Sequence, residues 1–216
     1  MPVFASSFKV VHKFPGQGFD GKNPTGLIVD KAGNLYGAAY QGGSTACTNG
    51  CGLVYELSPS SGGWIYKVLY GFKGQKSGDG SDPNGLVMDS AGNLYGTTFS
   101  GGSNNLGTLY ELSPSQSGTW TETILYTFQT GAGLGYEPQA ALIMDSGSNL
   151  YGTTSNGAAG DCNPLCGTAF ELSPPAAPGG QWTATVVRSF QSYADGGNTG
   201  NPLLLDAEGN LYGTSS

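Results

Sequence analysis

Charged residues are scarce in this chain of 216 residues, of which they make up 11%, against roughly 25% in an ordinary domain. Such a low charge content excludes a charge-rich helical bundle or a coiled coil. The chain has 8 Lys or Arg residues and 15 Asp or Glu residues, which gives a net charge of −7. Because a nucleic-acid-binding surface needs clustered cations, we expect no nucleic-acid partner.

Long hydrophobic runs are also lacking. No apolar run approaches the ~20 residues that span a bilayer, and residues 1–8 have neither the basic region nor the long apolar region of a signal peptide. We therefore expect no membrane insertion. If the protein is secreted, its signal peptide has been removed or lies upstream of this sequence.

Glycine, in contrast, is abundant, with 38 residues and no strict three-residue period, which rules out a collagen helix. Hydrophobic residues make up 38% of the chain, too many for a disordered protein. Many turns must therefore separate many short apolar segments. The composition predicts an all-β globular protein.

The dominant feature is an eight-residue pattern that occurs four times. It reads Asp-x-x-x-Asn-Leu-Tyr-Gly and starts at Asp30, Asp89, Asp145 and Asp206. Three copies are followed by a Gly/Asn-rich loop, a segment that ends in Glu-Leu-Ser-Pro, and an apolar stretch that starts with Trp. Each complete unit thus contains four β-prone runs, which we name strands a, b, c and d. In the first unit they cover residues 26–30, 34–40, 53–57 and 64–72.

A repeat of about 60 residues with four antiparallel strands is what a β-propeller blade requires. The sequences of residues 92–98 and 107–114 (Gly-Asn-Leu-Tyr-Gly-Thr-Thr and Gly-Thr-Leu-Tyr-Glu-Leu-Ser-Pro) resemble the GloVer tandem repeats of secreted, surface-anchored bacterial proteins. The pattern is also similar to NHL-type propeller repeats. This resemblance covers essentially the whole chain and implies a propeller on the bacterial surface, but it implies little about activity.

The two chain ends each supply part of a blade. Residues 8–14 read as a lone strand d, whereas residues 203–206 and 210–215 read as strands a and b. We therefore expect one domain, a four-bladed propeller whose incomplete blade is closed by the N- and C-terminal strands. Its units are residues 15–72, 73–128, 129–190, and 191–216 plus 1–14. The alternative is a fragment, or a dimeric half, of a larger propeller, with a homodimer formed through the incomplete blade.

The four cysteines form two pairs of identical spacing, Cys47 with Cys51 and Cys162 with Cys166. Local pairs in even number favour two disulfides and an oxidising compartment. A four-thiolate zinc site is the rival interpretation, but the spacing differs from that of zinc sites and loops far apart in sequence would have to meet.

Variable polar loops are expected on one face of the propeller, because the turns between antiparallel strands alternate between its two faces. This loop face carries the b-to-c and d-to-a loops, and such loops are common binding sites. We expect an acid-lined pocket there that binds a neutral sugar or a cation. Its acids are Asp20, Asp79, Asp82, Glu137, Asp161 and Asp195, and its other candidate ligand contacts are Asn23, Tyr40, Asn84, Phe99, Tyr136 and Asn201. The alternative interpretation is that these acids only stabilise turns.

Few catalytic constellations fit the sequence. The single histidine, His12, is expected on an outer strand d, where it could not serve a Ser-His-Asp triad. Glycoside hydrolysis by two carboxylates remains a candidate, with pairs drawn from Asp20, Asp79, Asp82, Glu137 and Asp195. Asp79 and Asp82 are weak Ca²⁺ candidates because their loop lacks the full ligand ladder of calcium loops. We expect no other cofactor or metal.

Residues that recur in every unit are expected to be structural. The recurring Glu of strand c (Glu56, Glu111 and Glu171) predicts a repeated hydrogen bond, with a backbone amide of the next blade as the suggested partner. The Trp that begins strand d (Trp64, Trp120 and Trp182) predicts packing at the blade edge.

Taken together, the sequence predicts an extracellular or cell-surface binding or display module, with carbohydrate as the leading ligand class. The alternative is a glycoside or ester hydrolase that uses the loop carboxylates. A third interpretation is a purely structural spacer.

Overall fold

The computed structural model describes residues 9–15, 20–131, 134–157, 166–177, 179–191, 196–197 and 199–215. Within these ranges it is an all-β structure whose one helix is the 3-10 helix η1 (Gln75–Ser77). None of the helices in the described part of the chain is long and apolar enough to cross a membrane.

Two complete antiparallel sheets come first, each with its four strands in sequence order. The first sheet contains β1 (Gly21–Val29), β2 (Leu35–Gly42), β3 (Leu53–Ser60) and β4 (Gly63–Gly71). The second sheet contains β5 (Gly80–Met88), β6 (Leu94–Gly101), β7 (Thr108–Pro114) and β8 (Trp120–Thr127). These strands are the predicted strands a to d of the first two units.

The third sheet has a divided first strand. It contains β9 (Tyr136–Pro138), β10 (Ile143–Met144), β11 (Leu150–Asn156), β12 (Thr168–Ser173) and β13 (Thr183–Ser189). Both β9 and β10 pair with β11, so the expected strand a is present in two pieces. The fourth sheet contains only β14 (Leu204–Leu205) and β15 (Leu211–Tyr212).

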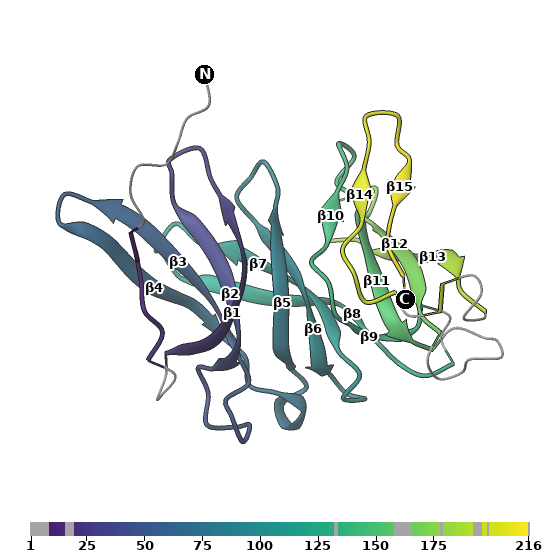
Figure 1. Cartoon of the computed structure of the whole chain (residues 1–216), viewed down its shortest axis with the longest axis horizontal. Helices are drawn as coiled ribbons and strands as arrows, with labels where there is room; N and C mark the ends of the chain where they lie inside the picture. Colours follow the sequence, from purple (N-terminus) through teal and green to yellow (C-terminus); the bar gives the residue numbers. More distant parts are fainter. Residues whose placement is uncertain are drawn as a thin grey trace.

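The four sheets follow one another in sequence order along the longest axis of the molecule (Figure 1). The first sheet lies at one end, and the third sheet and the β14–β15 sheet, which overlap in this view, lie at the other (Figure 1). The sheets are thus arranged as in a β-propeller, but the expected closure of a blade by the two chain ends is not formed.

The N-terminal segment packs against the first sheet instead. Residues 9–15 form no strand, and Phe14 lies edge-on against Tyr55 of β3, with ring centroids 5.1 Å apart. A closed blade would need this segment beside β15, with no strand c to bridge the two. Phe14 is partly buried by the first sheet, where the ring of Tyr55 provides an apolar surface.

The repeated eight-residue pattern forms the same turn in all four sheets. In the first, the Asp30 carboxylate accepts hydrogen bonds from the Ala32 N–H (2.8 Å), the Asn34 N–H (2.9 Å) and the Tyr36 hydroxyl (3.2 Å). Equivalent bonds form around Asp89, Asp145 and Asp206. Since every partner lies within six residues, the turn is specified locally.

The recurring Glu of strand c forms a repeated hydrogen bond, as predicted, but with a different partner. The Ser58 hydroxyl donates to the Glu56 carboxylate over 2.8 Å, and the same bond recurs at Ser113 and Ser173. The partner is therefore a serine two residues along the same strand, and not a backbone amide of the next sheet as suggested by the sequence.

Aromatic contacts between neighbouring sheets also recur. Trp120 packs on Tyr36 of the preceding sheet with ring centroids 6.3 Å apart, and Trp182 packs on Tyr95 in the same way at 5.9 Å. These contacts confirm the packing role predicted for two of the three Trp residues. A second recurring contact joins the Phe at the end of the predicted strand d to the aromatic residue of the next strand c. It pairs Phe72 with Tyr110 at 5.0 Å and Phe128 with Phe170 at 5.6 Å.

Candidate functional site

Three equivalent positions on the loop face share an unusual backbone conformation. Asn23, Asp82 and Glu137 each precede a proline and have φ values of 56°, 61° and 57°. Residues other than glycine avoid this left-handed region, and the surrounding structure must hold them there. The backbone is thus fixed at one point in each of three sheets, whereas the side chain differs from sheet to sheet.

Hydrogen bonds to the preceding sheet hold two of these positions. The Asp82 N–H donates to the Cys51 carbonyl over 2.9 Å, and the Glu137 N–H donates to the Leu106 carbonyl over 3.0 Å. Each acid is therefore placed where two sheets meet. A disulfide joins Cys51 to Cys47, as predicted, and stabilises the loop that supplies the first of these carbonyls.

Each of these side chains pairs with a polar residue at the end of strand b in its own sheet. The Asn23 amide donates to Gln41 Oε1 over 3.3 Å. Asn156 Nδ2 donates to the Glu137 carboxylate. In the second sheet, burial raises the pKa of Asp82, and hydrogen bonds of Asp82 with Ser81 and Ser100 oppose this rise. The three strand-b partners are equivalent to one another, because each lies five residues after the repeated Tyr: they are Gln41, Ser100 and Asn156.

Tyr40, near the end of β2, interacts electrostatically with both acids. Burial raises the pKa of Tyr40, and the negative charges of Asp82 and Glu137 raise it further. Its phenol is therefore within electrostatic reach of two carboxylates that come from two other sheets. We name Tyr40, Asp82, Glu137 and Asn156 the mouth site.

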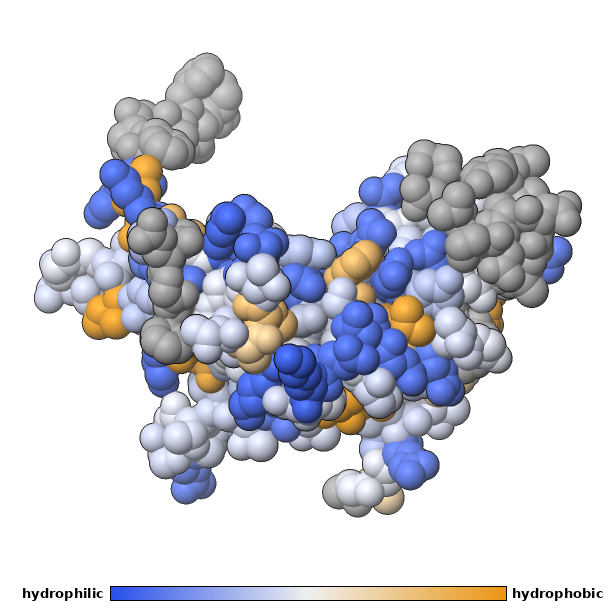
Figure 2. Space-filling view, turned by 90° about the horizontal axis from the view of Figure 1, so that it is seen from below, coloured by the Kyte–Doolittle hydropathy of each residue, from blue (hydrophilic) through white to orange (hydrophobic). Residues whose placement is uncertain are grey.

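Figure 2 shows the molecule from below Figure 1, which is the side of the b-to-c and d-to-a loops, and hydrophilic residues cover much of the middle of this face. A hollow of about 360 Å³ on this side is lined by residues of the first b-to-c loop, including Ser44 and Asn49, together with Lys22. A cleft also lies where the a-to-b turns of the first and second sheets meet, a location that the sequence did not indicate. It has a volume of about 580 Å³ and includes Asp30 and Trp120 in its lining.

Asp79 lies away from the mouth site and holds its own loop together. Its carboxylate accepts hydrogen bonds from the Tyr70 hydroxyl (2.9 Å), the Lys73 N–H (2.8 Å) and the Gly80 N–H (2.6 Å). Glu122 of β8 shares the same hydroxyl at 3.3 Å. Burial, and then the charge of Asp79, raise the pKa of Glu122 to about 7. This buried acid pair between the first two sheets was not found from the sequence.

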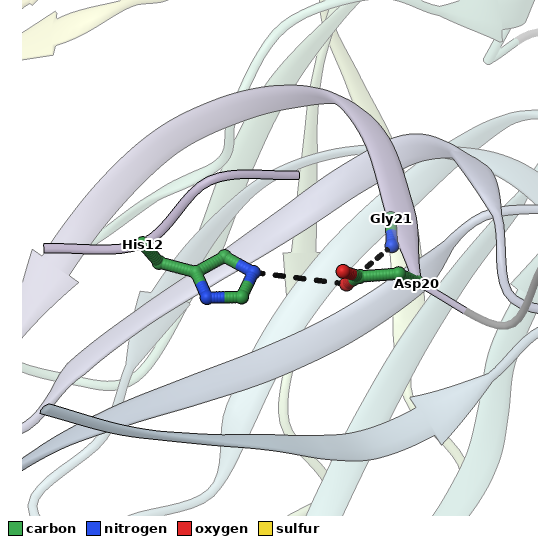
Figure 3. Close-up of polar contacts among 3 residues, drawn as sticks. All are labelled: His12, Asp20 and Gly21. Atoms are coloured by element: carbon green, nitrogen blue, oxygen red, sulfur yellow. Dashed lines mark hydrogen bonds and ion pairs between the residues drawn. The ribbon is translucent and has the colours of Figure 1, made fainter. Parts of the chain in front are cut away.

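Asp20 occupies the position in the first sheet that Asp79 occupies in the second. Figure 3 shows that it faces His12, with 3.7 Å between His12 Nε2 and Asp20 Oδ1, and that it accepts a hydrogen bond from the Gly21 N–H over 2.9 Å. His12 stacks on Tyr66, with ring centroids 4.1 Å apart. The histidine was expected on an outer strand d but lies in a segment without strand structure. We assign this group to the packing of the N-terminal segment.

The remaining ligand candidates are dispersed. Asn84 is buried, and its amide joins two sheets by donating to Thr97 Oγ1 (3.0 Å) and to the Pro138 carbonyl (2.8 Å), which gives it a packing role. Phe99 is half-buried at the position equivalent to Tyr40, and Tyr136 packs against the core between the second and third sheets. Asn201 is exposed near the fourth sheet. Three candidates, Asp161, Asp195 and Cys162, lie outside the described residues, whereas Cys166 is disulfide-bonded.

Within the described ranges, no three side chains of His, Cys, Asp or Glu gather closely enough to hold a metal ion. The Ca²⁺ candidates Asp79 and Asp82 are turned to different partners. The first is bound to Tyr70 and backbone amides, and the second to serines of its own sheet.

The stacked sheets and the repeated turns define a propeller-type repeat protein. The chain belongs to the Gloeobacter/Verrucomicrobia repeat family, whose sequence profile matches residues 44–216. Among solved structures, a gluconolactonase from Xanthomonas campestris is similar in fold, with a TM-score of 0.55 and 16% sequence identity. The similarity covers 95% of this chain and 59% of the gluconolactonase, so the chain spans little more than half of that protein. No curated protein matches the sequence at a significant level.

Proposed function

We propose that the chain is a carbohydrate-binding module of an extracellular or cell-surface protein, and that the mouth site contacts the ligand. The observation that carries this proposal is that Tyr40 of one sheet is within electrostatic reach of Asp82 and Glu137, which come from two other sheets. Carboxylate and amide groups accept and donate hydrogen bonds to sugar hydroxyls, while the tyrosine ring offers a surface on which a sugar can stack. The disulfide between Cys47 and Cys51 supports an oxidising compartment.

The proposal is tested by screening the chain on a glycan array and measuring the affinity of each hit by calorimetry. The Tyr40→Ala variant is expected to weaken binding at least about tenfold, because it removes the stacking surface. Asp82→Asn and Glu137→Gln are each expected to retain measurable affinity, because an amide still bonds to hydroxyls. Asp20→Asn is the matched control, since it removes the same charge at a distance from the mouth site. Unchanged binding by Tyr40→Ala would contradict the proposal.

A hydrolase is the second candidate, and a specific observation favours it. Burial raises the pKa of Asp82, which suits a proton donor, and the charges of both Asp82 and Glu137 act on the same tyrosine, Tyr40. The structural neighbour is named a gluconolactonase. The hydrolase proposal would replace the binding proposal if the chain hydrolysed sugar lactones or aryl glycosides, and if Asp82→Asn abolished this turnover but retained ligand affinity. If neither the glycan array nor the hydrolase assays gave a signal, the structural spacer would be the remaining interpretation.

A further inference from the structure

A cleft of about 590 Å³ lies between the second and third sheets, and none of its described lining residues belongs to the mouth site. One wall is the outer part of the second sheet, with Glu111 of β7 and Thr123 of β8. The other wall is the turn that joins strands c and d of the third sheet, with Gly180, Gln181 and Trp182. Both walls come from sheets that contain all four types of strand.

The equivalent place between the first and second sheets is taken by Lys67. Its ammonium group donates a hydrogen bond to the Gly118 carbonyl, in the c-to-d turn of the second sheet, over 3.0 Å. The cross-strand partner of Lys67 is Glu56, so a cation and a carboxylate lie opposite each other in the first sheet. The chain thus uses a primary ammonium group of its own to bridge these two sheets.

This ammonium group is absent between the second and third sheets. Thr123 takes the place of Lys67, because it is the cross-strand partner of Glu111 in the second sheet. Gly180 corresponds to Gly118, because each lies two residues before the Trp that begins strand d. The cleft therefore keeps the acid and the turn glycine of the first pair of sheets, but threonine is too short to bridge them.

The cleft carries a negative charge without a cation beside it. Glu111 is the one charged residue among the described residues that line it. Its carboxylate accepts a hydrogen bond from the Ser113 hydroxyl over 2.8 Å, which leaves further lone pairs for another donor. Burial, and then the charge of Glu111, raise the pKa of Tyr95 on the same side of the sheet. A positively charged donor is the ligand group that complements this cleft.

The other lining residues favour a ligand with a ring and hydroxyl groups. Trp182 is half-buried, and its ring packs on Tyr95 with centroids 5.9 Å apart, which holds it at the cleft. An indole ring attracts a nearby cation and offers an apolar surface. Gln181 and Thr123 are exposed and can exchange hydrogen bonds with hydroxyl groups. The volume of the cleft suits a small molecule better than the tip of one lysine side chain.

We propose that this cleft binds an amino sugar. The ammonium group of the sugar takes the place that Lys67 has between the first two sheets, and it donates to the Glu111 carboxylate and the Gly180 carbonyl. The sugar ring lies against Trp182, and its hydroxyl groups bond to Gln181. The cleft is separate from the mouth site, so this binding does not depend on the function proposed for the mouth site.

Calorimetric titration of the full chain with a hexamer of β-1,4-linked glucosamine tests the proposal. We expect saturable binding. The fully N-acetylated hexamer is expected to bind at least about tenfold more weakly, because acetylation removes the positive charge that Glu111 attracts. Lysine amide is the third probe, and it is also expected to bind more weakly, because it has the ammonium group without the ring.

Matched variants locate the binding. Thr123→Lys gives the cleft the lysine of the first sheet and is expected to weaken binding of the glucosamine hexamer at least about tenfold. Ser90→Lys is the control, because it also copies a lysine of the first unit, Lys31, at a position that does not line the cleft. It is expected to leave binding unchanged. If Thr123→Lys fails to fold, Glu111→Gln replaces it. An amide still accepts the Ser113 bond but lacks the charge, so binding is expected to weaken at least about fivefold.

The variant Tyr40→Ala separates this proposal from the one for the mouth site, since it is expected to leave binding of the glucosamine hexamer at the cleft unchanged. The inference is overturned by a lack of saturable binding, by equal affinity of the two hexamers, or by wild-type affinity of a folded Thr123→Lys variant. Tighter binding of lysine amide than of the glucosamine hexamer would also overturn it, because the cleft would then be a site for a protein side chain.

Discussion

The first and second sheets share one sequence pattern but differ in their neighbours. The second sheet is packed between two others, whereas the first has a sheet on one face and mainly the short N-terminal segment on the other. Leu86 and Leu27 hold the same place in the pattern, yet they are 5% and 51% exposed. The pattern thus builds the sheet, and the neighbouring sheet buries it, as expected for a repeat protein whose units stabilise one another.

The largest expected effect comes from removing an aromatic contact between two enclosed sheets. Phe128→Ala is expected to lower the free energy of unfolding by about 3 to 5 kcal/mol, because it empties a fully buried site against Phe170. Phe14→Ala, at the equivalent place on the first sheet, is expected to cost less than about 2 kcal/mol, because its ring is half-buried. Urea unfolding measures both, and equal losses would remove the distinction between the sheets.

The free energy of unfolding is expected to depend on pH because of Glu122 in the second sheet. The equivalent position of the first sheet is expected to contribute no such dependence. Burial and Asp79 raise the pKa of Glu122 to about 7 in the folded protein, so the folded state binds this proton more tightly than the unfolded state. Its contribution to stability is therefore complete below about pH 4.5 and is lost as the pH rises through 7. Tyr66 takes the place of Glu122 in the first sheet.

We expect the free energy of unfolding to fall by about 1 to 3 kcal/mol between pH 5 and pH 8, after allowance for partial exposure of the carboxyl. The Glu122→Gln variant is the control, and its stability is expected to vary little over this range. A variant with the same pH dependence as the wild type would show that another group is responsible.

Substitutions in the turn at the repeated Asp are expected to lower the stability equally in the first and second sheets, because the hydrogen bonds of this turn are local. Asp30→Ala and Asp89→Ala each remove a carboxylate that accepts the same set of hydrogen bonds. Each is expected to cost about 1 to 2 kcal/mol. Thermal unfolding of the two variants, with Lys31→Ala and Ser90→Ala as neutral neighbours, measures this. A loss at Asp89 twice that at Asp30 would mean that the adjacent sheet supports the turn.

The smallest effect is expected on the open face of the first sheet. Val29 is 65% exposed, so Val29→Ala is expected to change the free energy of unfolding by less than about 0.5 kcal/mol. Met88→Ala, its partly buried counterpart in the second sheet, is expected to cost more. A substantial loss at Val29 in urea unfolding would show that this face is covered in solution.

The parts of the fold that depend on short-range interactions could be predicted from the sequence. The turn at Asp30 needs only residues up to Tyr36, so its pattern identified the hairpin in every unit. The division of the third strand a follows from one extra residue. Seven positions separate Pro138 from Asp145, whereas six separate Pro83 from Asp89. The additional residue interrupts pairing with β11, and this effect was overlooked.

The position of the N-terminal segment depends on distant partners and could not be read from the sequence. In the sequence, His12 and Phe14 correspond to Tyr70 and Phe72 at the end of a strand d. This correspondence correctly indicates that the rings of His12 and Phe14 contact each other, as those of Tyr70 and Phe72 do. Strand pairing also needs an adjacent open edge, and none of the local residues specifies where that edge lies. The segment therefore keeps the contacts of a strand d without its hydrogen bonds.

The candidate site was predicted in part, because loop acids three residues apart have different roles. Asp79 and Asp82 both belong to the same loop, but only Asp82 directly precedes proline and adopts a positive φ at the mouth site. Its partner Ser100 has no distinctive residue type. The one feature of the sequence that identifies Ser100 is its position, five residues after the repeated Tyr, which it shares with Gln41 and Asn156 of the other two sheets.

Native-state hydrogen exchange tests most directly the central claim that burial comes from the neighbouring sheet. We expect the amides of β6 and β7, in the sheet with neighbours on both faces, to exchange most slowly. Those of β2 and β3 should be intermediate, and those of β14 and β15 should exchange fastest, although all contain the same repeated sequence. Equal protection of β6 and β15 would contradict the claim, because it would show that the repeat stabilises each sheet without its neighbour.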